Sequence, residues 1–194
     1  MIINIDENQA GLIWMAASAK AEWMVKNNWP SIQSTKMKNW NLNPTEEQTY
    51  HQAIGLAGEA AVHLWIFGNL SRFFIQQQIN NDGTTGDGGE DIPGVNIKSV
   101  DSLCNEPLKQ MMMIAPTQIS SDIIYLQTLV IINNPYEFIY NLKVQIIGAI
   151  SGASIMNNFK VEQGQSRRPC YQIPFDLLYP PEALLWDEQK RKIK

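Results

Sequence analysis

Apolar residues recur at helical spacing near the start of the chain and predict a helix over residues 7–27. Leu12, Met15, Ala16 and Ala19 fall on one face, and Trp23 continues it. In an amphipathic helix such an apolar stripe ordinarily packs on the core. A polar, Pro-marked loop is expected from residue 28 to residue 44.

A second helix is predicted over residues 45–67, with Thr45 as its cap and acidic residues in its first turn. Glu59 is the only formal charge between Gln48 and Ser71, so this helix is apolar nearly all round and should be buried. Gly55 and Gly58 each cost about 1 kcal/mol relative to Ala inside a helix. Their presence indicates close packing or a close approach by another group.

Short strands are predicted after the Gly- and Asp-rich loop at 80–91. Two of them cover about 89–92 and 95–100, and residues 101–121 look irregular. The continuous apolar run at 123–132 is typical of a central strand covered on both faces. Residues 137–147 alternate and predict a half-exposed strand, whose buried face would carry Phe138, Tyr140, Leu142, Val144 and Ile146.

The C-terminal part is expected to complete the core. Residues 151–158 predict a short helix capped by Ser151, residues 170–174 an edge strand, and the apolar segment that begins at Phe175 closes the core. The fold class is therefore α/β or α+β, with helices flanking a central sheet. We expect one domain over 1–194, made of an N-terminal helix and loop (1–44), a core (45–185) and a frayed tail (186–194).

Composition narrows the class of protein. Hydrophobic residues make up 44% of the 194, which favours a globular domain, and the net charge of −4 counts against non-specific coating of nucleic acid. The two cysteines, Cys104 and Cys170, lack metal-ligand spacing and suit a reducing cytoplasm. Neither a signal peptide nor an apolar run of about 18 residues is evident, so a cytoplasmic location without a membrane partner is expected.

Four residues are candidates for a catalytic or metal-binding role: Glu59, Asp91, Asn96 and Lys98. A carboxylate on a buried helix, such as Glu59, needs a cation, a metal or hydrogen bonds, although exposure or pairing with Arg72 would also serve. Asp91 stands where a turn becomes a strand; it is either a turn former or a displayed functional group. Asn96 and Lys98 share a strand face, where Lys98 could stabilise phosphate charge or merely protect a sheet edge.

Taken together, the segments GLAGEAAVHLW (55–65), GGEDIP (88–93) and NIKSV (96–100) resemble the PD-(D/E)XK nuclease superfamily, in particular its small phage and bacterial members. The resemblance covers about residues 45–185. It implies a restriction endonuclease-like core with a mixed sheet of four to five strands. It also implies Mg²⁺ or Mn²⁺ held by Glu59 and Asp91, with Lys98 assisting the attacking water. Asn96 stands where the family has Asp or Glu, and as a ligand it brings no charge.

The expected activity is hydrolysis of DNA phosphodiester bonds, which would make the protein a metal-dependent deoxyribonuclease. DNA could meet basic residues that lie outside the motif: Lys36, Lys38, Lys143, Lys160, Arg167 and Arg168. One alternative is a catalytically weakened nuclease-fold protein that binds DNA or a protein partner. Another is a calcium-binding role for the Gly- and Asp-rich loop. A homodimer is a possible state of the protein, since many members of the superfamily dimerise.

Overall fold

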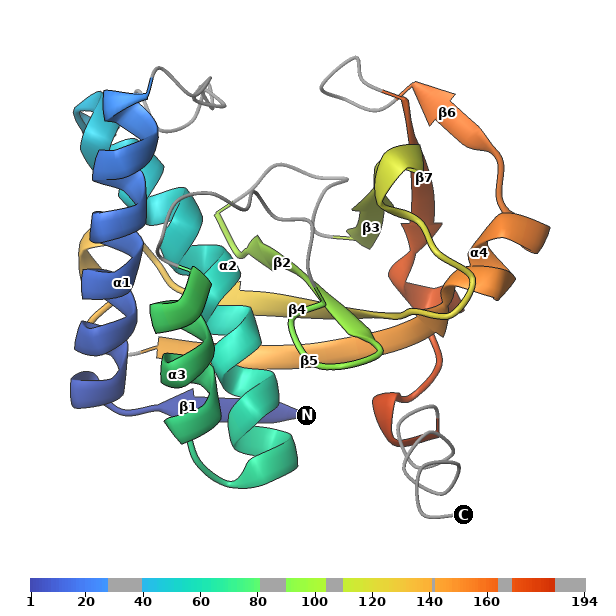
Figure 1. Ribbon diagram of the computed structural model, residues 1–194, viewed down its shortest axis with the longest axis horizontal. Helices are drawn as coiled ribbons and strands as arrows, with labels where there is room; N and C mark the ends of the chain where they lie inside the picture. Colours follow the sequence, from blue (N-terminus) through green and yellow to red (C-terminus); the bar gives the residue numbers. More distant parts are fainter. Residues whose placement is uncertain (28–39, 81–89, 104–109, 141, 164–168, 184–194) are drawn as a thin grey trace.

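The computed structural model describes residues 1–27, 40–80, 90–103, 110–140, 142–163 and 169–183 (Figure 1). It is a mixed α+β fold with two sheets. The first sheet has the strand order β1-β5-β4-β2, in which only the β4–β2 pair is parallel. The strands of this sheet are β1 (Ile2–Ile5), β2 (Val95–Asp101), β4 (Ile124–Ile131) and β5 (Leu142–Ser151).

Three helices cover one face of this sheet, in the left part of Figure 1. They are α1 (Glu7–Lys26), α2 (Pro44–Phe67) and α3 (Ser71–Asn80). Both long helices were predicted, whereas α3 was not. Helix α2 begins one residue earlier than expected, since its cap is Asn43 rather than Thr45. The Asn43 side chain accepts the backbone N–H groups of Thr45 and Glu46, at 3.0 and 2.9 Å. Pro44 takes the first helical position, where a missing N–H costs nothing.

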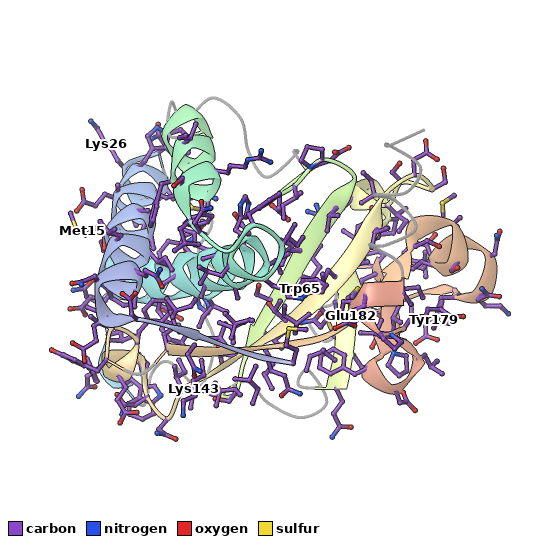
Figure 2. The ribbon with its side chains drawn as sticks, turned by 90° about the horizontal axis from the view of Figure 1, so that it is seen from below. Met15, Lys26, Trp65, Lys143, Tyr179 and Glu182 are labelled. Carbon is purple, nitrogen blue, oxygen red and sulfur yellow. The ribbon has the colours of Figure 1, made fainter. Side chains whose placement is uncertain are left out.

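The face of α1 that packs on the core is not the one that the sequence pattern indicates. Its buried residues are Ala10, Ile13, Ala17 and Ala21. Leu12, Met15 and Trp23 are instead 49, 68 and 39% exposed, and Figure 2 shows Met15 and Lys26 pointing away from the rest of the molecule. The physical reason lies in α2, which presents Ala53, Ala57, Ala60 and Ala61 to the shared core. Two helices lined with alanine approach closely, so the larger side chains of α1 remain outside.

Helix α2 lies between α1 and the sheet, as a helix that is apolar nearly all round should. On the sheet side, Val62 packs with Ile97 and Leu126. Gly58 meets the sheet so closely that a Cβ there would stand 2.0 Å from the Ser99 Oγ. The close approach expected from the two glycines is thus confirmed at Gly58, while the space beside Gly55 is open.

The central strand was predicted well, and its neighbour in part. Strand β4 is buried along nearly its whole length, as expected of residues 123–132. In β5 the buried residues Leu142, Val144 and Ile146 alternate with Lys143 and Gln145, as predicted. The segment before it is not a strand, because Asn134 caps a 3₁₀ turn over Pro135–Glu137. Tyr140 is therefore 69% exposed rather than buried.

A second, antiparallel sheet of three strands packs on the other face of the first. Its order is β3-β7-β6, with β3 (Met111–Ile114), β6 (Val161–Gln163) and β7 (Pro169–Pro174). A strand at 170–174 is confirmed as β7, but the prediction that it is an edge strand is wrong, because β7 lies in the middle of this sheet. Strands β3 and β6 were not predicted. Helix α4 (Gly152–Asn158) is confirmed, with the Ser151 Oγ accepting the Ser154 N–H. Met112, Ile114 and Ile173 join Tyr125 and Ile150 in the core between the sheets.

Among the residues that the structure describes, none of the helices is both long and apolar enough to cross a bilayer.

Candidate functional site

The candidate residues gather where a tight turn enters β2. Ile92 and Val95 form a single antiparallel bridge, with Pro93 and Gly94 between them. Gly94 has a φ of 81°, which a Pro-Gly type II turn requires. The Glu90 carboxylate accepts the Gly94 N–H and fixes the turn from the other side. The strand predicted at 89–92 is therefore only this bridge, within its described residues, and the chain folds back along the start of β2.

Asp91 closes the open edge of β2. Among the residues that the structure describes, this strand is the outermost of its sheet, and beyond the bridge at Val95 its far side has no neighbouring strand. The Asp91 Oδ2 accepts the backbone N–H of Ile97 at 2.5 Å. A carboxylate satisfies that N–H and discourages a further strand from pairing there. The position of Asp91 is thus set by the backbone of β2 itself.

Asn96 and Lys98 share one face of β2, as the alternation predicts, and that face is turned away from α2. Val95 and Ile97 pack with Val62 of α2, so the even-numbered side chains point to the opposite side. The Lys98 Nζ donates to the Oε1 of Gln118, at 3.3 Å, in the 3₁₀ turn Pro116–Gln118. Gln118 could not be expected at the site from the sequence, because it belongs to the segment 101–121 that was predicted to be irregular.

The Asn96 side chain is unusual because its Oδ1 is buried without a hydrogen-bond partner among the described residues. A buried acceptor left unsatisfied costs about 1–3 kcal/mol. Such atoms are rare in folded proteins, and functional sites are one place where they occur. An oxygen that lacks a donor is free to ligate a cation.

Glu59 comes to the region from α2, on the other side of the sheet. It is half-buried, and Gln77 of α3 donates its Nε2–H to the Glu59 Oε2 at 3.0 Å. The guanidinium of Arg72, the ion-pair partner considered from the sequence, lies 4.7 Å from the centre of the Phe67 ring. Glu59 and Lys98 approach from opposite faces, and they could share a ligand only past the open edge of β2.

His63 lies one helical turn after Glu59 and faces the same region. It is 3% exposed, and its ring lies against Phe67 and Phe73. Burial lowers its pKa below the ordinary value; the nearby Asp91 backbone carbonyl opposes this shift and Arg72 adds to it. Neither ring nitrogen is in hydrogen-bonding geometry with a described residue. His63 is therefore a buried side chain with a lowered pKa, and it lies next to the Asp91 backbone.

The oxygen and nitrogen atoms of these side chains determine whether the candidate site can bind a divalent metal ion. Within the described part of the chain, no three His, Cys, Asp or Glu side chains lie where they could hold one ion together. The Asp91 carboxylate accepts the backbone N–H of Ile97, the residue after Asn96, so the two residues offer one carboxylate and one amide oxygen from neighbouring positions. Mg²⁺ often takes only one or two carboxylates and keeps several waters, so these two residues fit a sparsely ligated ion.

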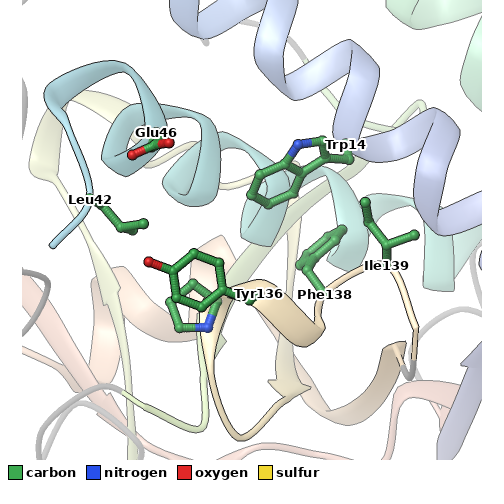
Figure 3. A pocket seen from close by; sticks show the side chains of 7 residues that line it. Trp14, Leu42, Glu46, Tyr136, Phe138 and Ile139 are labelled. Atoms are coloured by element: carbon green, nitrogen blue, oxygen red, sulfur yellow. The ribbon is translucent and has the colours of Figure 1, made fainter. Parts of the chain in front are cut away.

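A separate cavity of about 200 Å³ lies between α1, the start of α2 and the turn at Pro135–Glu137 (Figure 3). Trp14, Phe138 and Tyr136 form much of its wall, with Glu46 at one side. The Tyr136 hydroxyl donates to the Trp40 carbonyl oxygen at 2.7 Å, which holds the ring in place. None of the residues proposed from the sequence lines it, so it is distinct from the candidate site.

The structure describes two of the six basic residues proposed for DNA contact. Lys36, Lys38, Arg167 and Arg168 lie outside the described residues. Lys143 and Lys160 are exposed, on β5 and just after α4.

Comparison of the chain with protein-family models, with curated proteins and with solved structures found no match.

Proposed function

We propose that the protein hydrolyses DNA phosphodiester bonds with the help of Mg²⁺ or Mn²⁺, on a restriction endonuclease-like core. One observation carries the proposal: among the described residues the buried Oδ1 of Asn96 has no hydrogen-bond partner, while the Asp91 carboxylate accepts the N–H of the next residue, Ile97, and Lys98 shares the strand face of Asn96. An amide oxygen without a donor, a carboxylate and an ammonium group in one short stretch suit a site for a cation and a phosphate together.

Each residue has a distinct role in this proposal. Asp91 and Asn96 would hold the metal ion, with Glu59 as a further carboxylate reaching around the edge of β2. The bound ion would supply Lewis-acid chemistry at the phosphate. Lys98 would place a positive charge beside the phosphate and orient the water, and Gln118 would restrict the Lys98 ammonium to one direction. Because Asn96 is neutral, the site would bind its ion less tightly than one with a second carboxylate.

The first experiment is cleavage of plasmid and of single-stranded DNA, with Mg²⁺ and then Mn²⁺. Lys98→Ala should lower the rate by about 100-fold, since loss of one charged group at a developing anion has effects of this size. Lys26→Ala is the matched control, because it removes an exposed lysine at the end of α1 that has no proposed role in binding DNA or metal. Equal rates for Lys98→Ala and the parent would contradict the proposed role.

Asp91 is better tested by Asp91→Asn than by alanine. The amide oxygen can still accept the Ile97 N–H, so the edge of β2 is preserved while the negative charge is lost. We expect cleavage to be abolished with little change in the unfolding midpoint. Asp122→Asn alters an exposed acid elsewhere and should leave both quantities unchanged.

Asn96 supplies a readout that does not depend on activity. Millimolar Mg²⁺ should raise the melting temperature of the parent, because a ligand that binds only the folded state stabilises it. Asn96→Leu should remove that rise and, without metal, unfold at higher temperature than the parent, since the unsatisfied oxygen is gone. Asn96→Asp should strengthen the effect of Mg²⁺. A parent whose melting temperature ignores Mg²⁺ and Mn²⁺ would argue against the metal site.

A second candidate is a protein of the same fold that binds DNA or a protein partner without cutting. The observation in its favour is that no three ionisable ligands converge among the described residues. A folded parent that binds DNA, remains inert with both metals and gains cleavage through Asn96→Asp would support this candidate over the first.

A further inference from the structure

One buried side chain, that of Tyr125, holds the segment of residues 115–123 that carries Gln118. Tyr125 lies in β4 and is completely buried. Its hydroxyl donates to the Gln118 carbonyl oxygen at 2.6 Å and accepts the Ser120 N–H at 2.9 Å. Burial raises the pKa of Tyr125 above its ordinary value, against the opposing effect of the Ser120 N–H, so the hydroxyl keeps the proton that it donates. A single group therefore fixes the backbone on both sides of Ile119.

The ring of Tyr125 is itself anchored in the core between the two sheets. It belongs to the same buried cluster as Met112 and Ile150. A buried ring in a closely packed core keeps one orientation, so its hydroxyl stays at one place. Ile119 and Ile123 of the same segment also pack on this cluster. The segment is thus attached to the core by apolar contacts as well as by the two hydrogen bonds.

Gly152 holds the same segment from a second side. A Cβ at Gly152 would collide with the Ser120 carbonyl oxygen, so the segment can approach this closely only because the residue is glycine. The Gly152 N–H also donates to the Ile123 carbonyl oxygen at 2.8 Å. The segment is therefore fixed to β4 through Tyr125 and to the start of α4 through Gly152.

Tyr125 also lies beside the candidate site on the sheet. In the parallel pair of β2 and β4, Tyr125 is the register partner of Asn96, and Gln127 is the register partner of Lys98. Side chains of register partners point to the same face of a sheet, from strands about 5 Å apart. Tyr125 therefore leaves the sheet next to Asn96, on the face that also carries Lys98. It connects this face of the central strand to the backbone of Gln118.

The hydrogen bond between Lys98 and Gln118 needs such a support. It is 3.3 Å long, and the Gln118 side chain is exposed. A bond between two long side chains at the surface contributes little when both must be ordered to form it. A backbone that is already fixed leaves less freedom to lose, so the same bond restricts the ammonium group more effectively.

We propose that Tyr125 is a positioning residue of the candidate site: its hydroxyl fixes the backbone of Gln118, and Gln118 directs the Lys98 ammonium toward the phosphate. This inference rests on the proposed hydrolysis of phosphodiester bonds. In this role Tyr125 touches neither the phosphate nor the metal ion, and it acts only through Gln118. Misplacing a catalytic group by about 1 Å can cost about 100-fold in rate, so a buried hydroxyl behind the site can influence the chemistry.

Tyr125→Phe tests the proposal because it removes the hydroxyl and keeps the ring. In DNA cleavage with Mg²⁺, kcat should fall about tenfold or more, while KM for DNA changes less than about threefold, because Lys98 is misplaced and the other DNA contacts remain. Tyr50→Phe is the matched control, since Tyr50 is another buried tyrosine, in α2 on the opposite face of the sheet. An unchanged kcat in Tyr125→Phe, or equal losses in the two variants, would overturn the proposal.

A double-mutant cycle separates positioning from a general loss of stability. If Tyr125 acts through Lys98, adding Tyr125→Phe to Lys98→Ala should lower the remaining rate no further. A residue that only stabilises the fold would lower the rate by the same factor in both backgrounds. Each variant is assayed well below its own melting temperature, because Tyr125→Phe loses two hydrogen bonds. Equal factors in the two backgrounds would overturn the positioning role.

The reactivity of the Lys98 amine tests the same inference without any cleavage of DNA. Trace labelling with acetic anhydride, read by mass spectrometry, compares Lys98 with the exposed Lys160 of the same molecule. Gln118 holds the amine and competes with the reagent, so both Tyr125→Phe and Gln118→Ala should raise the relative labelling of Lys98 about twofold or more, the effect of losing one hydrogen bond. A parent that cuts no DNA but shows this rise would contradict the proposed hydrolysis and support the positioning. Unchanged labelling of Lys98 in Tyr125→Phe would overturn the positioning, whatever the activity of the parent.

Discussion

Replacing Gly58 by alanine should destabilise the protein although alanine is the better helix former. The new Cβ would lie 2.0 Å from the Ser99 Oγ, 2.4 Å from the Thr128 Oγ1 and 3.1 Å from the Ser99 Cβ. No contact as short as the first two can persist. Either the Ser99 and Thr128 side chains turn away, or α2 moves off the sheet.

The loss of stability in Gly58→Ala can be estimated from the contacts that the new Cβ would disturb. Turning Ser99 breaks its 2.9 Å hydrogen bond with the fully buried Thr128, and leaving such a group unsatisfied costs about 1–3 kcal/mol. Overpacking of the remaining contacts costs about 1–3 kcal/mol more. The gain in helix propensity returns only about 1 kcal/mol. We therefore expect the free energy of unfolding to fall by about 1–5 kcal/mol.

Gly55→Ala is the control within the same helix. No atom outside its own stretch of helix backbone lies within 4 Å of a Cβ at that position, so alanine should stabilise the protein by about 0.5–1 kcal/mol. Urea denaturation followed by tryptophan fluorescence and by helical circular dichroism would measure both variants, and an unchanged slope would show that both unfold similarly. A Gly58→Ala protein as stable as Gly55→Ala would refute the close approach of α2 to β2.

Two further predictions concern a helix cap and a buried histidine. Asn43→Ala should lower the free energy of unfolding by about 1 kcal/mol while Thr45→Ala changes it little, because only Asn43 accepts the N–H groups at the start of α2; equal losses in urea denaturation would contradict this cap. His63 binds a proton less readily when folded than when unfolded, so its contribution to stability is complete above its ordinary pKa of 6.5 and falls as the pH drops below it. The free energy of unfolding, measured from pH 8 to pH 5, should therefore decline less in His63→Phe than in the parent. The neighbouring Phe67 and Phe73 can accommodate the new ring. Parallel stability curves for the two proteins would refute a depressed pKa for His63.

The sequence predicts best the elements whose pattern is long and whose burial is one-sided or complete. Strand β4 and the part of helix α2 from Ala53 to Val62 are largely apolar, and the structure buries most of both. The short elements β1, β3 and β6 have only three or four residues each, too few for an alternation to show. Helix α3 was missed because its sequence, SRFFIQQQIN, is polar on most sides and relies on Phe73 for its anchorage.

The sequence pattern predicts the wrong buried face for α1, and the reason is physical. Counting large apolar residues selects the side with Leu12 and Met15, but the core selects the side where Ala10, Ala17 and Ala21 allow the closest approach to α2. For the candidate site, the sequence predicts that Asn96 and Lys98 share a strand face and that Asp91 lies at a turn. It could not predict that α2 lies on the other side of the sheet and therefore separates Glu59 from Lys98.

The pairing of β1 with β5 has a consequence for the order in which the chain can assemble. Ile2, Asn4 and their neighbours are synthesised long before their register partners, Gln145 and Lys143. Closing so long a loop is entropically costly and slow, and domains with many such distant pairings fold late. Ile3 and Ile5 must therefore wait, unpaired, until β5 has been synthesised. A chain arrested before β5 would leave these two side chains accessible to chaperones, and a chain that includes β5 can bury them against the core.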